Sequence, residues 1–230
     1  MHSLQRKKLI KCLESGYPRD LKKLAAHVSQ PKLPFALRQF LFTLDFPDEP
    51  LPSDLNSCPE FEGHIKVHHS AIATFYAPSD LCGPGGMRQE RIRSTPAFHG
   101  HPRLDTVFVV LDDSKPRMEG MEIGRVLLFF SFFYRHKPYS CALINWFVHD
   151  DEPDADTGMW TVQLERDEKH EPTVQIIPVE TIARAAHLLP IYGSTRVPDD
   201  FSHHDALDSF NSFFVNHFAD HHAHKFITGQ

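Results

Sequence analysis

The chain has 230 residues, of which 41% are hydrophobic and 23% are charged, as in ordinary globular proteins. Its 24 Lys and Arg against 30 Asp and Glu give a formal net charge of −6, which excludes a uniformly basic nucleic-acid coat protein. The longest nearly apolar run, at 126–134, is far shorter than the roughly 20 residues of a membrane helix. We expect no membrane partner and, because the first residues lack a signal-peptide core, an intracellular protein.

The amino-terminal segment, residues 1–45, is basic: nine Lys or Arg and only two acids lie within the first 38 positions. Its apolar residues recur every three to four positions, which predicts helices at 4–13, 21–28 and 35–44. Prolines and acids then crowd residues 46–60, a composition typical of an extended linker.

The remaining residues, 61–230, are predicted to form one α+β domain. Runs of β-branched and aromatic residues predict strands at 65–76, 106–111, 123–134, 140–148, 159–164 and 173–179. Both alternating sets of 140–148 are apolar, which indicates a central strand buried on both faces. Helical periodicity follows at 180–189 and 205–226. The fold class is therefore α+β, with a compact antiparallel sheet or small β-barrel at about 104–190 packed between amino-terminal and carboxyl-terminal helices.

A glycine-rich turn at 81–86 leads into a basic stretch that contains Arg88, Arg91 and Arg93. We expect this stretch to be helical. Such a turn can aim backbone N–H groups at an anion while the arginines neutralise it. It matches neither nucleotide fingerprint, because Met87 and Arg88 stand where a P-loop needs Lys and Ser or Thr. Such a sequence most often forms a tight turn followed by solvated arginines. The functional alternative is that the three arginines contact phosphate or nucleic acid.

The carboxyl-terminal helix would place His217, His221 and His224 on one face, where imidazoles one turn apart can chelate zinc. No HExxH glutamate or further ligand is identifiable, so polar surface and capping roles are the favoured interpretation. The four cysteines contain no CxxC pair, and no spacing nominates a nucleophile with its base. We expect buried thiols, no catalytic residue, no bound metal and no cofactor. A metal-dependent enzyme that uses the histidine face is the last alternative.

Ordered strings of this sequence resemble the carboxyl-terminal region of fungal Plavaka-type transposase proteins. The resemblance covers about residues 33–226. It is carried by HSAIATFYAPSDL (69–81), GGMRQERIR (85–93), DTVFV (105–109), GMEIGRV (120–126), YSCALINWF (139–147), DADTGMW (154–160), RAAHL (184–188), VNH (215–217) and DHH (220–222).

That family implies DNA cutting and joining by a DDE carboxylate triad on an RNase H-like core, which would lie upstream of the matched region. By this resemblance the chain looks like a detached tail that lacks the core. It would be a nuclear, non-catalytic, transposon-derived scaffold whose partners are DNA or a full-length transposase.

A second resemblance concerns residues 105–189, whose order of elements is similar to that of BAH modules. These are small β-barrel domains of chromatin proteins that bind histone tails or other proteins. No aromatic cage is identifiable in the sequence. The alternative function is therefore a chromatin or protein-interaction module, whose acidic body would suit a basic partner better than DNA.

Overall fold

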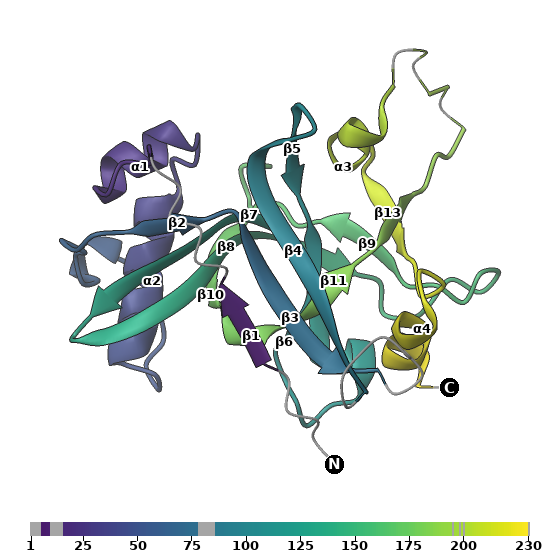
Figure 1. Cartoon of the computed structure of the whole chain (residues 1–230), viewed down its shortest axis with the longest axis horizontal. Coiled ribbons are helices and arrows are strands. Elements are labelled where there is room, and N and C mark those ends of the chain that lie inside the picture. Colours follow the sequence, from purple (N-terminus) through teal and green to yellow (C-terminus); the bar gives the residue numbers. More distant parts are fainter. Residues whose placement is uncertain are drawn as a thin grey trace.

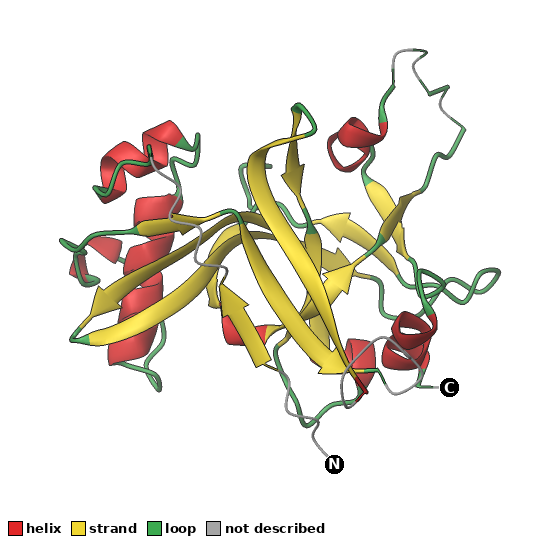
Figure 2. Cartoon of the chain, viewed as in Figure 1, coloured by secondary structure: helices red, strands yellow, loops and turns green. Residues whose placement is uncertain are grey.

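The computed structural model describes residues 6–9, 16–77, 86–194, 196–197, 199 and 201–229. It confirms the predicted α+β class: antiparallel strands form a nearly closed, barrel-like sheet, with helices at its ends (Figures 1 and 2). No helix within these ranges is long and apolar enough to cross a membrane.

The described strands form two sheets in which the paired strands are antiparallel. The larger sheet has the order β11-β6-β7-β8-β9-β13-β12, with β10 also paired to β8 and β2 to β7. Its strands are β2 (Lys66–His68), β6 (Thr106–Val110), β7 (Met121–Tyr134), β8 (Lys137–His149), β9 (Thr161–Leu164), β10 (Val174–Pro178), β11 (Ile182–Ala186), β12 (Leu188–Pro190) and β13 (Ser212–Val215).

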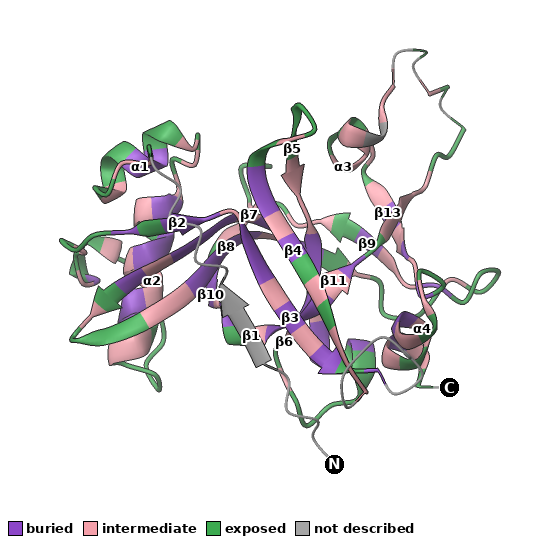
Figure 3. Ribbon diagram, viewed as in Figure 1, coloured by how far each residue is buried: buried purple, intermediate pink, exposed green. Residues whose placement is uncertain are grey.

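The smaller sheet has the order β1-β3-β4-β5. Its strands are β1 (Arg6–Leu9), β3 (Ser70–Tyr76), β4 (Met87–Phe98) and β5 (His101–Leu104). Buried and more exposed positions alternate along β3 and β4 (Figure 3), because successive side chains of a strand point to opposite faces. Strands β3 and β4 contact β11, and β4 contacts β7, so the smaller sheet lies against the open side of the larger one.

The interior of the barrel-like sheet holds the barrel cluster of buried apolar residues. It combines residues from both sheets, and its largest members lie on β7 and β8. The barrel cluster consists of Ala71, Ala73, Ile92, Val107, Val109, Val126, Phe129, Ala142, Ile144, Trp146, Ile177, Val179 and Ile182. As predicted, the segment 140–148 is a central strand, since β8 pairs with β7 along one edge and with β9 and β10 along the other.

Helices α1 (Leu21–His27) and α2 (Leu33–Asp45) confirm two of the predicted amino-terminal helices. Asp20 caps α1 by accepting a hydrogen bond from the Lys23 backbone N–H at 2.9 Å, and a proline stands in the first turn of α2. Both helices pack on one end of β7 and β8 (Figure 1). The helix cluster that results contains Leu24, Ala25, Leu33, Ala36, Leu37, Leu41, Ile65, Val67, Leu128, Phe130, Phe132, Cys141, Leu143 and Ile176.

Two predicted helices are wrong: the one at 4–13 and the one in the basic stretch that follows the glycine-rich turn. Within the predicted helix 4–13, the described residues form strand β1, paired with β3. The stretch after the turn belongs to β4, also paired with β3. In both places the helical spacing of apolar residues is outweighed by the backbone hydrogen bonds that a neighbouring strand offers. The turn itself, at 78–85, lies outside the described residues.

The predicted helix at 180–189 is also wrong, and the one predicted at 205–226 is helical only at its two ends. Residues 182–190 form β11 and β12, because β11 completes the barrel-like sheet beside β6. Residues 206–228 divide into α3 (Ala206–Ser209), β13 and α4 (His221–Thr228). Phe213 and Val215 alternate along β13 and are buried against β9 and α4, so the strand period replaces the helical one.

Candidate nucleic-acid interface

The β4–β5 hairpin carries several arginines on a protein whose net charge is negative. The pairing runs from Ser94 opposite Leu104 to Phe98 opposite His101, and the turn has His99 and Gly100 at φ of 52° and 90°. Glycine suits this turn because it adopts positive φ without steric cost. Figure 1 shows the hairpin rising at the upper edge of the molecule, between the α1–α2 side and α3.

The structure separates the three arginines that the sequence singles out. Strand alternation places Arg91 and Arg93 on one face of β4 and Arg88 on the other. Arg91 is exposed and has no ion-pair partner among the described residues. The charge of Arg88 is instead one of the smaller causes that lower the pKa of Asp220. A helix would have paired Arg88 with Arg91 and turned Arg93 away; the strand pairs Arg91 with Arg93.

Two further residues join Arg93 on the hairpin. The guanidinium carbons of Arg93 and Arg103 lie 4.8 and 4.9 Å from the centre of the Phe98 ring, within cation–π range. The Asp105 carboxylate accepts hydrogen bonds from Arg103 Nε at 2.7 Å and from the Arg93 backbone N–H at 2.8 Å. Burial lowers the pKa of Arg93, and the charges of Arg103 and Arg91 add to this effect against the attraction of Asp105. Arginine stays protonated regardless, so the crowded positive charge favours a bound anion.

Sequence reasoning missed both Arg103 and Phe98. A signal was present, since His99 and Gly100 stand between two segments that contain Arg, Phe and Thr, a pattern typical of a β-hairpin turn. Assigning the preceding stretch to a helix hid that pattern.

A cleft of about 400 Å³ separates the hairpin from β11 and α4. Its floor is Arg184, which is only 4% exposed. Arg184 Nη2 lies 2.7 Å from Asp220 Oδ2, its Nε lies 3.9 Å from Glu90, and its guanidinium stacks 4.8 Å from the Phe75 ring centre. The guanidinium of Arg184 thus faces two carboxylates. This part of the cleft holds neighbouring elements together and does not offer a free positive charge to a ligand.

The histidines predicted for one helix face are not brought together as a set of three. His217 precedes α4 and is buried, with its ring 5.2 Å from that of His224. The exposed His221 faces His222 instead. The Nδ1 atoms of His217 and His224 are buried without a hydrogen-bond partner. Burial and the neighbouring His224 lower the pKa of His217, which favours its neutral form. Within the described ranges, no group of three or more His, Cys, Asp or Glu could hold a metal ion.

The described cysteines agree with the expectation of packed thiols. Cys58 and Cys141 are buried and free, and burial raises the pKa of the Cys141 thiol, with a smaller contribution from Glu180. The raised pKa keeps the Cys141 thiol protonated rather than activated as a thiolate. Cys12 and Cys82 lie outside the described residues.

No family model matches this chain, and no curated protein matches it. The resemblances to Plavaka-type transposase tails and to BAH modules therefore stay hypotheses. The β4–β5 hairpin is then the feature of the molecule that indicates a function.

Proposed function

We propose that this chain is a non-catalytic, transposon-derived scaffold that binds nucleic acid through phosphate contacts along the β4–β5 hairpin. One observation carries the proposal: Arg91, Arg93 and Arg103 share this hairpin, where Asp105 pairs with Arg103. The other hairpin carboxylate, Glu90, accepts from the Ala185 N–H and lies toward Arg184. Guanidinium groups are well suited to phosphate oxygens. The proposal extends to a nuclear role with DNA or a full-length transposase as partner, which the family resemblance implies.

The distribution of charge supports binding at one place rather than over the whole surface. The net charge of −6 repels phosphate in general, so an isolated basic hairpin would fix where nucleic acid docks. Strand β1 brings Arg6, Lys7 and Lys8 into register with β3 in the same small sheet. Phe98 adds an aromatic ring of the kind on which bases stack in single-strand binders.

Fluorescence anisotropy tests the proposal with labelled duplex and single-stranded DNA at about 50 mM and about 200 mM salt. Each phosphate contact contributes about −0.9 to the slope of log K against log salt. The double variant Arg91→Ala, Arg93→Ala should therefore weaken binding and reduce the magnitude of that slope by about 2.

The matched control is Lys115→Ala, Lys137→Ala, which removes two exposed cations outside the hairpin. It should leave the slope unchanged. Absent or salt-insensitive binding by the native chain would refute the proposal, and so would equal weakening by the two double variants.

A second candidate is a protein-interaction module of BAH type, favoured by the near closure of the sheet and by a groove of about 580 Å³ between α2 and β10. The groove is lined by apolar residues that include Phe40, Leu51 and Ile176. Calorimetric titration with histone-tail peptides tests it. Peptide binding that survives the loss of Arg91 and Arg93 would favour this candidate, and no heat with any peptide would count against it.

A further inference from the structure

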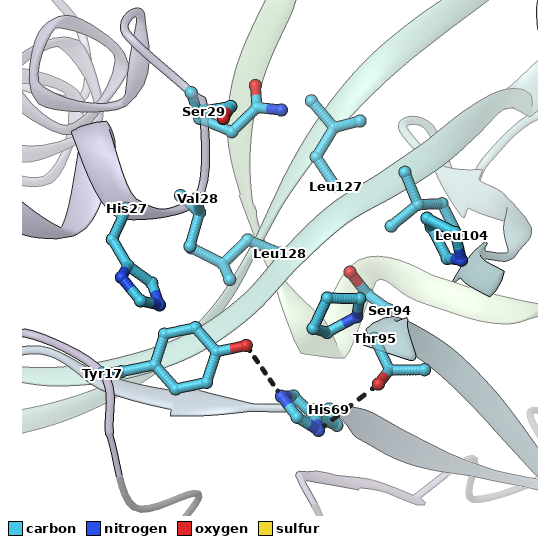
Figure 4. A pocket seen from close by; sticks show the side chains of 13 residues that line it. Tyr17, His27, Val28, Ser29, His69, Ser94, Thr95, Leu104, Leu127 and Leu128 are labelled. Carbon is cyan, nitrogen blue, oxygen red and sulfur yellow. Dashed lines mark hydrogen bonds between the residues drawn. The ribbon is translucent and has the colours of Figure 1, made fainter. Parts of the chain in front are cut away.

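A cavity of about 300 Å³ lies between the β4–β5 hairpin, the end of α1 and strand β7 (Figure 4). Its volume is at the small end of the range for ligand pockets, which begins at roughly 300 Å³. None of the described residues that line it is Asp, Glu, Lys or Arg. The described lining holds no permanently charged side chain, only the imidazoles of His27 and His69 and the phenol of Tyr17, so the cavity suits an uncharged ligand.

The polar groups of the cavity form a chain centred on His69. Tyr17 Oη lies 2.9 Å from His69 Nε2, and Thr95 Oγ1 lies 3.4 Å from His69 Nδ1. The Thr95 hydroxyl also donates to the Ala97 carbonyl at 3.3 Å. These contacts fix the His69 ring between Tyr17 and Thr95 at the edge of the cavity.

Ser94 supplies the observation that points to a ligand. It is only 3% exposed, and its Oγ is buried without a hydrogen-bond partner among the described residues, although its backbone N–H donates to the His69 carbonyl at 2.9 Å. Figure 4 shows this oxygen facing the space between Leu104 and Leu128. A buried hydroxyl without a partner costs about 1–3 kcal/mol, which a ligand that both accepts and donates a hydrogen bond would recover.

Much of the remaining lining is apolar. Val28, Leu127 and Leu128 lie across from the polar chain (Figure 4), with the polar Ser29 beside them. The lining also includes Gln30, Pro96, Pro102 and Leu104. A ligand that fits this lining has an apolar body and one hydrogen-bonding edge.

We propose that this cavity binds an uncharged nitrogen heterocycle of nucleobase size, with its polar edge on Ser94. The heterocycle has two sources: a free nucleobase or nucleoside, or an unstacked base of a single strand held by the hairpin. Only the second source rests on the proposed function. Strands β4 and β5 contribute Ser94 and Leu104 to the cavity and carry Arg93 and Arg103. The cavity therefore lies next to the arginines that would hold the backbone of a single strand.

Saturation-transfer NMR with adenosine, guanosine, cytidine and uridine tests the free source on the full chain. We expect one or more nucleosides to bind and the Ser94→Ala variant to weaken that binding about tenfold, which corresponds to the loss of about 1.4 kcal/mol. The variant should fold as well as the native chain, because it removes a hydroxyl that has no partner. The matched control, Ser53→Ala, changes an exposed serine and should bind like the native chain. Leu127→Trp should abolish binding by filling the cavity.

Anisotropy with a normal and an abasic single strand of equal length tests the second source. Tighter binding of the normal strand, lost in Ser94→Ala, supports a base in the cavity. The proposal is overturned if no nucleoside binds and if the two strands bind equally. Nucleoside binding without any DNA binding would sustain the cavity while refuting the hairpin function, so the two proposals fail separately.

Discussion

At the scale of single residues, Arg184 is a cation that the fold buries almost completely. Strand β11 carries its side chain into the interior, where it meets Asp220 at the start of α4, Glu90 on β4 and the Phe75 ring on β3. A buried cation is tolerated only with such partners. This one side chain therefore joins two strands of the small sheet to the carboxyl-terminal helix.

Replacing Arg184 with Met should lower the free energy of unfolding by about 3 kcal/mol, because the Asp220 and Glu90 carboxylates lose their partner. Urea denaturation followed by circular dichroism measures the change. The control is Arg196→Met, which breaks the Arg196–Asp199 pair, whose side chains are 84% and 87% exposed. That pair should contribute less than about 1 kcal/mol. Equal losses in the two variants would contradict the assignment.

Asp220 should make stability depend on pH in the acid range. Burial raises its pKa, but the hydrogen bonds from Arg184 and from the Ala223 N–H outweigh burial, and the net pKa is lowered. A lowered folded-state pKa gives stabilisation that is complete above the unfolded value, about 3.9, and is lost as pH falls through the folded value.

Asp220→Asn should flatten the stability profile below about pH 4, because Asn removes the titrating charge while keeping a capping oxygen for α4. Urea midpoints of both chains over falling pH measure the effect. Parallel profiles would show that another carboxylate governs acid unfolding.

At the scale of elements, the sequence predicts best where side-chain period and pairing agree. The alternating segments that became β6, β7, β8 and β10 and the helices α1 and α2 could be predicted from pattern alone. The segments 180–189 and 205–226 could not, because Ala and Phe at mixed spacings fit a helix as well as a strand. Long-range partners β6 and β9 decide between the two, and local pattern carries no information about such partners.

The candidate site follows the same division. Arg91 and Arg93 could be chosen as candidates from the sequence, because arginine suits phosphate and the two residues lie close together in the chain. Arg103 and Phe98 require knowledge of the hairpin register. The cavity beyond the hairpin requires still more, since Tyr17, His69 and Ser94 come from three separate segments of the chain.

The β7–β8 pair has a glycine at position 124, where the Ile144 side chain approaches the backbone closely. A Cβ added there would lie 2.9 Å from Ile144 Cδ1, closer than packed carbon atoms approach. Gly124→Ala should therefore destabilise the protein by about 1–3 kcal/mol through overpacking.

Ile144→Val removes the clashing Cδ1, so the double variant should be more stable than the sum of the two single changes predicts. A double-mutant cycle in urea measures this coupling. Strict additivity would mean that Ile144 is not the obstacle.

At the scale of the whole molecule, β7 and β8 hold both halves together. Phe129 and Ile144 belong to the barrel cluster, while their neighbours Phe130 and Leu143 belong to the helix cluster. Adjacent residues on a strand point to opposite faces, so one pair of strands is the wall between the two clusters. We infer that the amino-terminal helices and the barrel-like sheet unfold as one cooperative unit.

Leu37→Ala tests this coupling across the molecule. Leu37 is fully buried in α2, within the helix cluster, so truncation should cost about 3 kcal/mol. In a Trp160→Phe background, the remaining Trp146 reports on the barrel cluster. Its fluorescence midpoint in urea should fall together with the helical circular dichroism signal, because losing the helices uncovers one face of β7 and β8. The control is Thr43→Ala, an exposed position on the same helix, which should leave both midpoints nearly unchanged. If the Trp146 midpoint stayed in place while the helical signal fell, helices α1 and α2 would be a separate folding unit resting on an independent barrel.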